Sequence, residues 1–127
     1  MRKIIALLLV VVIAATTLSV MAFAASNSGI GTYKGKAYRC YVYCTDTYGY
    51  TSMSWAGTQF LVRACVRVDF HNRITGQEHL AGGYVDNTKF AEKRVDVYYG
   101  CVADCAIGTG CIDEIPFVNE IPAYPGR

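Results

Sequence analysis

The fold is decided by the stretch TQFLVRACVRVDF, residues 58–70, in which apolar and polar side chains alternate. The apolar face holds Phe60, Val62, Ala64, Val66, Val68 and Phe70. The opposite face holds Gln59, Arg63, Cys65, Arg67 and Asp69, and Leu61 alone departs from the pattern. Alternation with a period of two is typical of a β-strand with one buried face. A helix would spread the same apolar residues around its circumference.

Strand-like stretches lie on both sides of this segment. Residues 33–44 and 50–56 are rich in Tyr, Val, Thr and Trp, and residues 45–49 have turn chemistry, which predicts a hairpin. Residues 92–102 alternate again, and a short helical turn is expected over residues 86–93. Strands joined by short turns, without an amphipathic helix, predict an all-β fold, a small antiparallel β-sandwich or barrel.

The N-terminus predicts export. Arg2 and Lys3 precede an uncharged apolar run over residues 4–15, and Ala22-Phe23-Ala24 closes the segment. These are the parts of a secretory signal, so residues 1–24 are expected to form a cleaved signal helix. The alternative is an uncleaved membrane anchor of the same residues. We expect a secreted, extracellular protein that meets the membrane only through this signal before cleavage.

The charge of the mature chain excludes one class of partner. The chain has 12 Lys and Arg and 10 Asp and Glu, and Arg2 and Lys3 leave with the signal, so the mature domain is formally neutral. Nucleic-acid binding depends on a positive surface that displaces counterions from phosphates. Lys34, Lys36 and Arg39 are better interpreted as the solvated part of a strand. We expect no nucleic-acid partner.

The mature chain contains six cysteines: Cys40, Cys44, Cys65, Cys101, Cys105 and Cys111. An even number outside the cytoplasm predicts three disulfides that staple the β domain. The alternative is a zinc site, because the spacing C-x3-C occurs twice. Structural zinc sites favour C-x2-C or C-x4-C, so we expect neither a metal nor another cofactor.

The pairing of these cysteines is only partly constrained. In an extended strand, Cys40 and Cys44 have Cα atoms about 13 Å apart, and a disulfide needs roughly 4.4–6.8 Å. Local pairing within either C-x3-C segment is therefore excluded if both segments are extended. The early strand is then expected to be tied to Cys65 and to the C-terminal cysteines.

The chain divides into four segments on these grounds. The tail contains all three prolines and is expected to be extended at the surface, either packing over the sandwich or serving as a docking motif. The predicted segments are a signal peptide at 1–24, a flexible N-terminal segment at 25–32, a disulfide-linked β domain at 33–111 and a Pro-containing extended tail at 112–127.

No recognisable active site is present in the sequence. The two histidines, His71 and His79, lack H-x-x-x-H spacing, and no G-x-S-x-G motif occurs. Asp113 and Glu114 are interpreted as solvating tail charges. We expect no catalytic residues.

Tyrosine is the distinctive residue of this chain. There are ten, and Tyr41 and Tyr43 fall on one face of a predicted strand. Tyrosine combines an apolar ring with a polar tip, which suits binding surfaces. The alternative is that aromatic residues simply favour strands. With Trp55, these two tyrosines are the candidate binding residues, and the expected partner is a cell-envelope glycan or a secreted or surface protein.

Three stretches carry a resemblance to a known family: YRCYVY at 38–43, YTSMSW at 50–55 and VDVYYG at 95–100. In these stretches the chain resembles the lactococcin-972-like bacteriocins, small exported β-sandwich proteins of Gram-positive bacteria. The resemblance implies a secreted β-sandwich that interferes with cell-wall assembly in related bacteria. The six cysteines depart from that group's pattern, and no functional residue is transferred.

Three functional hypotheses follow. The leading one is a secreted, non-enzymatic binding or interaction module that uses exposed aromatic residues. The alternative is a secreted antibacterial, bacteriocin-like or toxin-like protein. The third is a small hydrolase that uses His71 or His79.

Overall fold

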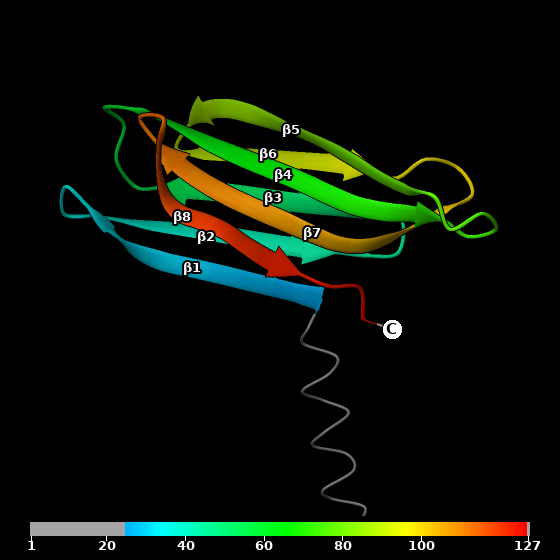
Figure 1. Cartoon of the computed structure of the whole chain (residues 1–127). Coiled ribbons are helices and arrows are strands. Elements are labelled where there is room, and N and C mark those ends of the chain that lie inside the picture. The colour runs from blue at the N-terminus through cyan, green and yellow to red at the C-terminus, as the bar shows by residue number, and fades with distance from the viewer. Residues whose placement is uncertain (1–24, 127) are drawn as a thin grey trace, which may run out of the picture.

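The structure, a computed structural model, describes residues 25–126, and these residues form eight β-strands (Figure 1). The predicted signal peptide, residues 1–24, lies outside the described residues. Within the described range, no helix is long and apolar enough to cross a bilayer. The strands are β1 (Ser26–Tyr33), β2 (Lys36–Cys44), β3 (Tyr48–Trp55), β4 (Leu61–Asn72), β5 (Glu78–Thr88), β6 (Phe90–Asp96), β7 (Cys101–Ile112) and β8 (Ile115–Ala123).

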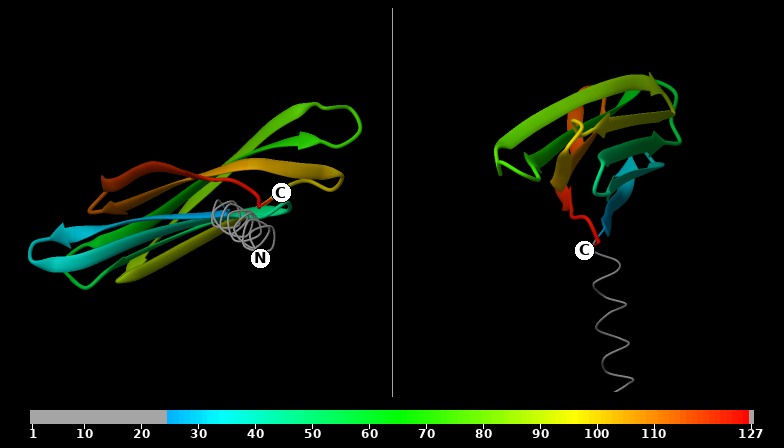
Figure 2. Two further views of the ribbon diagram at one scale, coloured as in Figure 1. Left: turned by 90° about the horizontal axis from the view of Figure 1, so that it is seen from below. Right: turned by 90° about the vertical axis from the view of Figure 1, so that its right-hand side faces the viewer.

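The strands form two antiparallel sheets that pack face to face as a sandwich. The first sheet has the order β1-β2-β3-β6 and the second has the order β5-β4-β7-β8. Strands β5 and β6 contact each other along one side, and β1 and β8 do so along the other (Figure 2). The prediction of an all-β antiparallel fold is confirmed, with a sandwich as the architecture.

Strand β4 follows the predicted alternation. Val62, Ala64, Val66, Val68 and Phe70 are buried between the sheets, and Cys65 points to the opposite face. Leu61 lies on the outer side with Arg63 and is exposed, which explains its place outside the apolar pattern. The predicted hairpin of β2 and β3 is also present, with Tyr43 paired to Tyr50.

The two sheets approach closely where β7 carries small residues. A Cβ atom on Gly108 would lie 2.2 Å from Cγ2 of Val42 and 2.6 Å from Oγ1 of Thr51. A Cβ atom on Gly110 would lie 2.5 Å from the sulfur of Met53. Carbon and sulfur atoms normally stay about 3.5–4 Å apart, so only glycine fits at these two positions.

Both ends of the domain differ from the prediction. Residues 25–32 are not a flexible segment, because Ser26–Tyr33 pairs with β2 along its whole length. Lys34 and Gly35 have φ angles of 50° and 71°, which is the left-handed backbone of a two-residue hairpin turn. Most of the tail beyond residue 112 also belongs to the β domain, as the edge strand β8. An edge strand tolerates proline because it pairs with a neighbour on one side only.

Two further expectations about the middle of the chain are corrected. Residues 86–93, predicted as a helical turn, are instead the end of β5 and the start of β6. The two strands are joined at Lys89, whose φ is 65°. The strand expected over residues 92–102 ends at Asp96, and β7 begins at Cys101 after a loop that contains Gly100 with a φ of 81°.

The three predicted disulfides are not present in the structure. Both C-x3-C segments lie in strands, as the exclusion of local pairs required, but within residues 25–126 no two sulfurs stand at disulfide distance. For one pair of cysteines, the register of β4 and β7 explains why the sulfurs are not at disulfide distance. Cys65 is opposite Thr109 and Cys111 is opposite Arg63. The two cysteines are therefore diagonal neighbours, whose Cα atoms are typically about 7–8 Å apart.

Gly108→Ala tests the close approach of the sheets. The added methyl group meets Val42 and Thr51 between two sheets, so we expect a loss of about 2 kcal/mol in the free energy of unfolding. The measurement is chemical denaturation of the purified protein. Gly83→Ala is the matched control, because its Cβ would meet only the flexible end of Lys93 at 2.9 Å. Equal losses in the two variants would contradict this packing.

Candidate functional site

Four tyrosines gather on the outer side of the first sheet. Alternation along β2 buries Cys40, Val42 and Cys44 and leaves Tyr41 and Tyr43 on the outer side. Alternation along β3 buries Thr51, Met53 and Trp55 in the same way. We call the half-buried outward set the tyrosine face: Tyr41, Tyr43, Tyr48 and Tyr50.

The rings of the tyrosine face form a nearly continuous platform. The rings of Tyr41 and Tyr43 are neighbours and nearly parallel. Their centroids are 6.5 Å apart, and the angle between their planes is 11°. Tyr48 lies 6.2 Å from Tyr43 with its ring tilted by 52°. The spacing follows from the strand itself, because alternate side chains on one face repeat about every 6.6 Å.

Strand β6 adds a charged rim to this platform. The hydroxyl of Tyr50 donates a hydrogen bond of 2.7 Å to Oε2 of Glu92. The guanidinium carbon of Arg94 lies 3.8 Å from the ring centroid of Tyr48, which is a cation–π contact. Arg94 also pairs with Asp96 at 2.8 Å. These three side chains supply donors and acceptors beside the rings.

The rim changes the acidity of one tyrosine. Partial burial raises the pKa of Tyr50, because it disfavours the phenolate, and the hydrogen bond to Glu92 raises this pKa further. The phenol therefore stays protonated at neutral pH and keeps donating to the carboxylate. The edge of the platform is held in one orientation by this bond.

The platform and its rim line an open hollow of about 700 Å³. This volume falls within the usual range for small-molecule sites, roughly 300–1,000 Å³. The lining residues are the four residues of the tyrosine face together with Val85, Glu92, Lys93 and Arg94. The hollow combines apolar ring faces with a few polar groups, and this is the usual composition of a recognition site.

The structure separates the three sequence-predicted binding residues. Tyr41 and Tyr43 stand together on the tyrosine face, but Trp55 points into the core and is only 2% exposed. The Trp55 indole donates to the backbone oxygen of Tyr33 at 3.2 Å, and its ring stacks on Phe60 at 6.1 Å. We therefore correct the predicted set, since Trp55 is a core residue.

Sequence reasoning missed Tyr48 and Tyr50 as partners of Tyr41 and Tyr43. The signal was available in the alternation of β3, where a two-residue count from the buried Trp55 places both tyrosines outward. The contribution of β6 had no such signal. Strand β6 pairs with β3 although the two strands are far apart in the sequence. Tyr50, for example, pairs with Arg94, which is more than forty residues later.

The two histidines have separate structural partners. His71 Nδ1 lies 2.7 Å from Oδ1 of Asp104, which is the extra residue of a bulge where β7 pairs with β4. The ring of His79 stacks on Phe70 at 5.4 Å. In the described part of the chain, no group of three or more His, Cys, Asp and Glu side chains could hold a metal ion.

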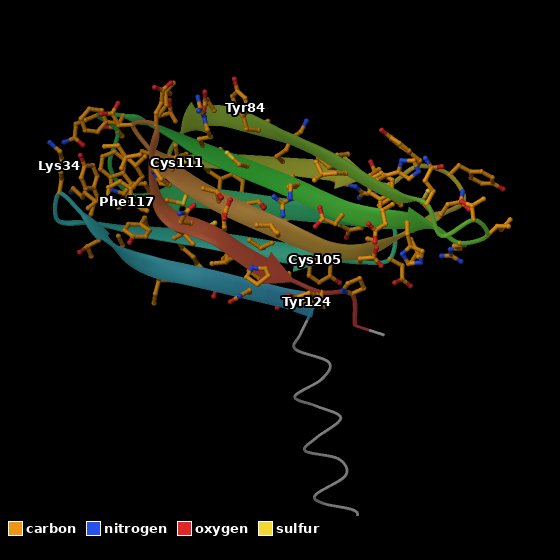
Figure 3. All side chains as sticks on the ribbon, in the orientation of Figure 1. Lys34, Tyr84, Cys105, Cys111, Phe117 and Tyr124 are labelled. Carbon is orange, nitrogen blue, oxygen red and sulfur yellow. The ribbon has the colours of Figure 1, made fainter. Side chains whose placement is uncertain are left out.

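Three cysteines come near one another at the end of β7. Cys65 and Cys111 are diagonal neighbours on β4 and β7, and Cys40 approaches from the first sheet, where its sulfur would be 3.0 Å from a Cβ on Gly110. Burial, together with the neighbouring Cys111 and Cys65, raises the pKa of Cys40 to about 12. A buried thiol in this state is a poor nucleophile at neutral pH. Figure 3 labels Cys111 at this end of the second sheet.

Comparisons with protein-family models, curated proteins and solved structures found no match to this chain. The fold and the surface define the class to which it belongs, a two-sheet antiparallel β-sandwich with an aromatic outer face. Its function is inferred below from its own geometry.

Proposed function

We propose that this protein is a secreted, non-enzymatic binding module that recognises cell-envelope glycans through the tyrosine face. The observation that carries the proposal is the pair of nearly parallel rings of Tyr41 and Tyr43 in an open, polar-rimmed hollow. Its secretion rests on the signal-like residues 1–24.

The chemistry of the tyrosine face suits a sugar chain. A pyranose ring has an apolar face of C–H groups that packs on an aromatic ring, and its hydroxyl groups point outward around its edge. Glu92 and Asp96 offer acceptors for those hydroxyls, and Arg94 offers donors. Tyrosine loses little conformational entropy on binding, because its side chain has only two rotatable angles.

Peptidoglycan is the glycan of choice for a test, because a secreted protein meets it outside the membrane. We expect the double variant Tyr41→Ser, Tyr43→Ser to bind purified insoluble peptidoglycan at least roughly tenfold more weakly, equivalent to about 1.4 kcal/mol. Loss of two stacked rings accounts for a change of this size. The measurement is co-sedimentation of the secreted protein over a range of peptidoglycan concentrations.

The matched control is Tyr84→Ser, Tyr99→Ser, which removes the same number of exposed tyrosines from elsewhere. Tyr84 is 58% exposed on the outer side of β5 (Figure 3), and Tyr99 lies in the loop before β7. The control should bind as the unmodified protein does. Equal weakening in both variants, or no binding by the unmodified protein, would count against the proposal.

A bacteriocin-like activity would use the same surface in a different way. A protein that binds a wall component and blocks its assembly should slow the growth of neighbouring Gram-positive bacteria. Adding the purified protein to such cultures separates the two functions, because a binding module leaves growth unchanged.

We also propose that oxidation outside the cell joins Cys65 to Cys111. The two thiols are diagonal neighbours on β4 and β7 and close enough to influence each other's pKa, so a local adjustment of the two strands would bring them to bonding distance. With oxidised glutathione as the oxidant, one disulfide forms in the protein and two glutathione thiols are released. A disulfide typically adds about 2–4 kcal/mol of stability.

Peptide mapping of the unreduced secreted protein tests this pair. We expect one cross-linked peptide that contains Cys65 and Cys111, with a mass lower by two hydrogen atoms than the reduced pair. Cys111→Ser should abolish this peptide. The proposal fails if Cys65 is found linked to another cysteine, or if both thiols are fully alkylated in the native product.

A further inference from the structure

We infer that the open edge of β1 pairs with β1 of a second copy of this chain, so that a two-fold dimer displays two tyrosine faces on one side. This inference concerns the assembly of the protein and stands whether or not the ligand is a glycan. It rests on the contrast between β1 and the other sheet edges.

The described sheets have four edge strands, and three of them are guarded. Strand β6 carries the charged residues Glu92, Lys93, Arg94 and Asp96. Strand β8 contains Pro116 and Pro122, and its pairing with β7 shifts register twice. Strand β5 carries the charged residues Glu78 and Asp86. Charges, prolines and irregular pairing are the usual means by which natural sheets prevent edge-to-edge association.

Strand β1 lies against β8 across the sandwich, where Asn27 donates a hydrogen bond of 3.1 Å to the backbone oxygen of Pro122, but its own sequence and pairing carry none of these guards. Its sequence SNSGIGTY contains no charged residue and no proline, and within residues 25–126 it pairs only with β2. An edge strand presents a row of backbone N–H and C=O groups that can hydrogen-bond to another strand. Ile30, in the middle of β1, is 77% exposed although it is a large apolar residue.

The occupant we infer is a second copy, because β1 is complementary to itself. In an antiparallel pair centred on Ile30, this residue meets the partner's Ile30, and Ser28 meets the partner's Thr32. Directly opposed apolar and hydroxyl pairs stabilise antiparallel strands, and like charges would destabilise them. The two β1 strands carry no charge of their own, although Arg39 of β2 lies opposite Ile30 on each flank, and a two-fold arrangement closes without further growth.

The dimer would have a direct consequence for binding. The first sheets of the two copies become one continuous sheet, and a two-fold axis perpendicular to that sheet keeps both tyrosine faces on the same side. Three strand spacings separate β2 from the partner's β2, or roughly 14 Å. Two linked sites on a repeating polymer bind more tightly than one, because the second contact is intramolecular.

Analytical ultracentrifugation of the secreted protein over a concentration series tests the inference. We expect a mass of two chains for the unmodified protein and of one chain for Ile30→Lys, in which two lysines would oppose each other across the pair. Ser28→Lys is a second variant with the same expected loss. Ile74→Lys is the matched control, because Ile74 is 95% exposed in the loop after β4 and should leave the dimer intact.

Hydrogen exchange identifies the surface involved. Backbone amides of β1 should exchange more slowly as the unmodified protein dimerises, and Ile30→Lys should remove this protection while the amides of β4 stay protected. A single-chain mass at every concentration would overturn the inference. So would a dimer that survives both lysine variants, or a dimer whose β1 amides exchange as fast as those of the monomer.

Discussion

The close contact between β7 and the first sheet is the constraint on which the rest of this structure depends. Gly108 faces Val42 and Thr51, and Gly110 faces Met53, at distances that leave no room for a side chain on β7. Side chains are thereby excluded from these two positions of β7. Along β2 and β3, the residues that alternate with the packed ones include the four tyrosines of the tyrosine face, and they stand outside. The alternation that packs Val42, Thr51 and Met53 against β7 thus also places these tyrosines on the outer surface.

The tyrosine face is organised by its neighbours rather than by burial alone. The backbone of β2 sets the spacing of Tyr41 and Tyr43, and β6 fixes the outer rim through Glu92 and Arg94. Because residues 25–127 carry ten Lys and Arg and ten Asp and Glu, long-range attraction contributes little to the encounters of this domain. Recognition would then depend on ring stacking and on short-range hydrogen bonds, both of which suit an uncharged sugar.

Local alternation made much of the fold predictable. It identified β4 correctly and the hairpin of β2 and β3, because one face of each strand is buried by a continuous core. It failed at β1, where glycine and serine have weak strand preference and pairing with β2 supplies the order. It failed at β8 because prolines suggested a tail, although an edge strand tolerates them.

The candidate site was predictable only in part, for a related reason. The period of two placed Tyr41 and Tyr43 outward, but the position of Trp55 depends on Tyr33 and Phe60, which reach it from other segments. The order of the second sheet and the diagonal placement of Cys65 and Cys111 are set by register between distant strands. Such non-local choices leave no mark in the local sequence pattern.

The most direct measurement of the central claim, that the outer side of the first sheet is a recognition surface, is an NMR titration. Isotopically labelled purified protein would be titrated with soluble peptidoglycan fragments. The resonances of Tyr41, Tyr43, Tyr48 and Tyr50 should shift together with that of Glu92, while those of β4 and β8 stay in place. Shifts confined to the second sheet, or none at saturating ligand, would contradict it.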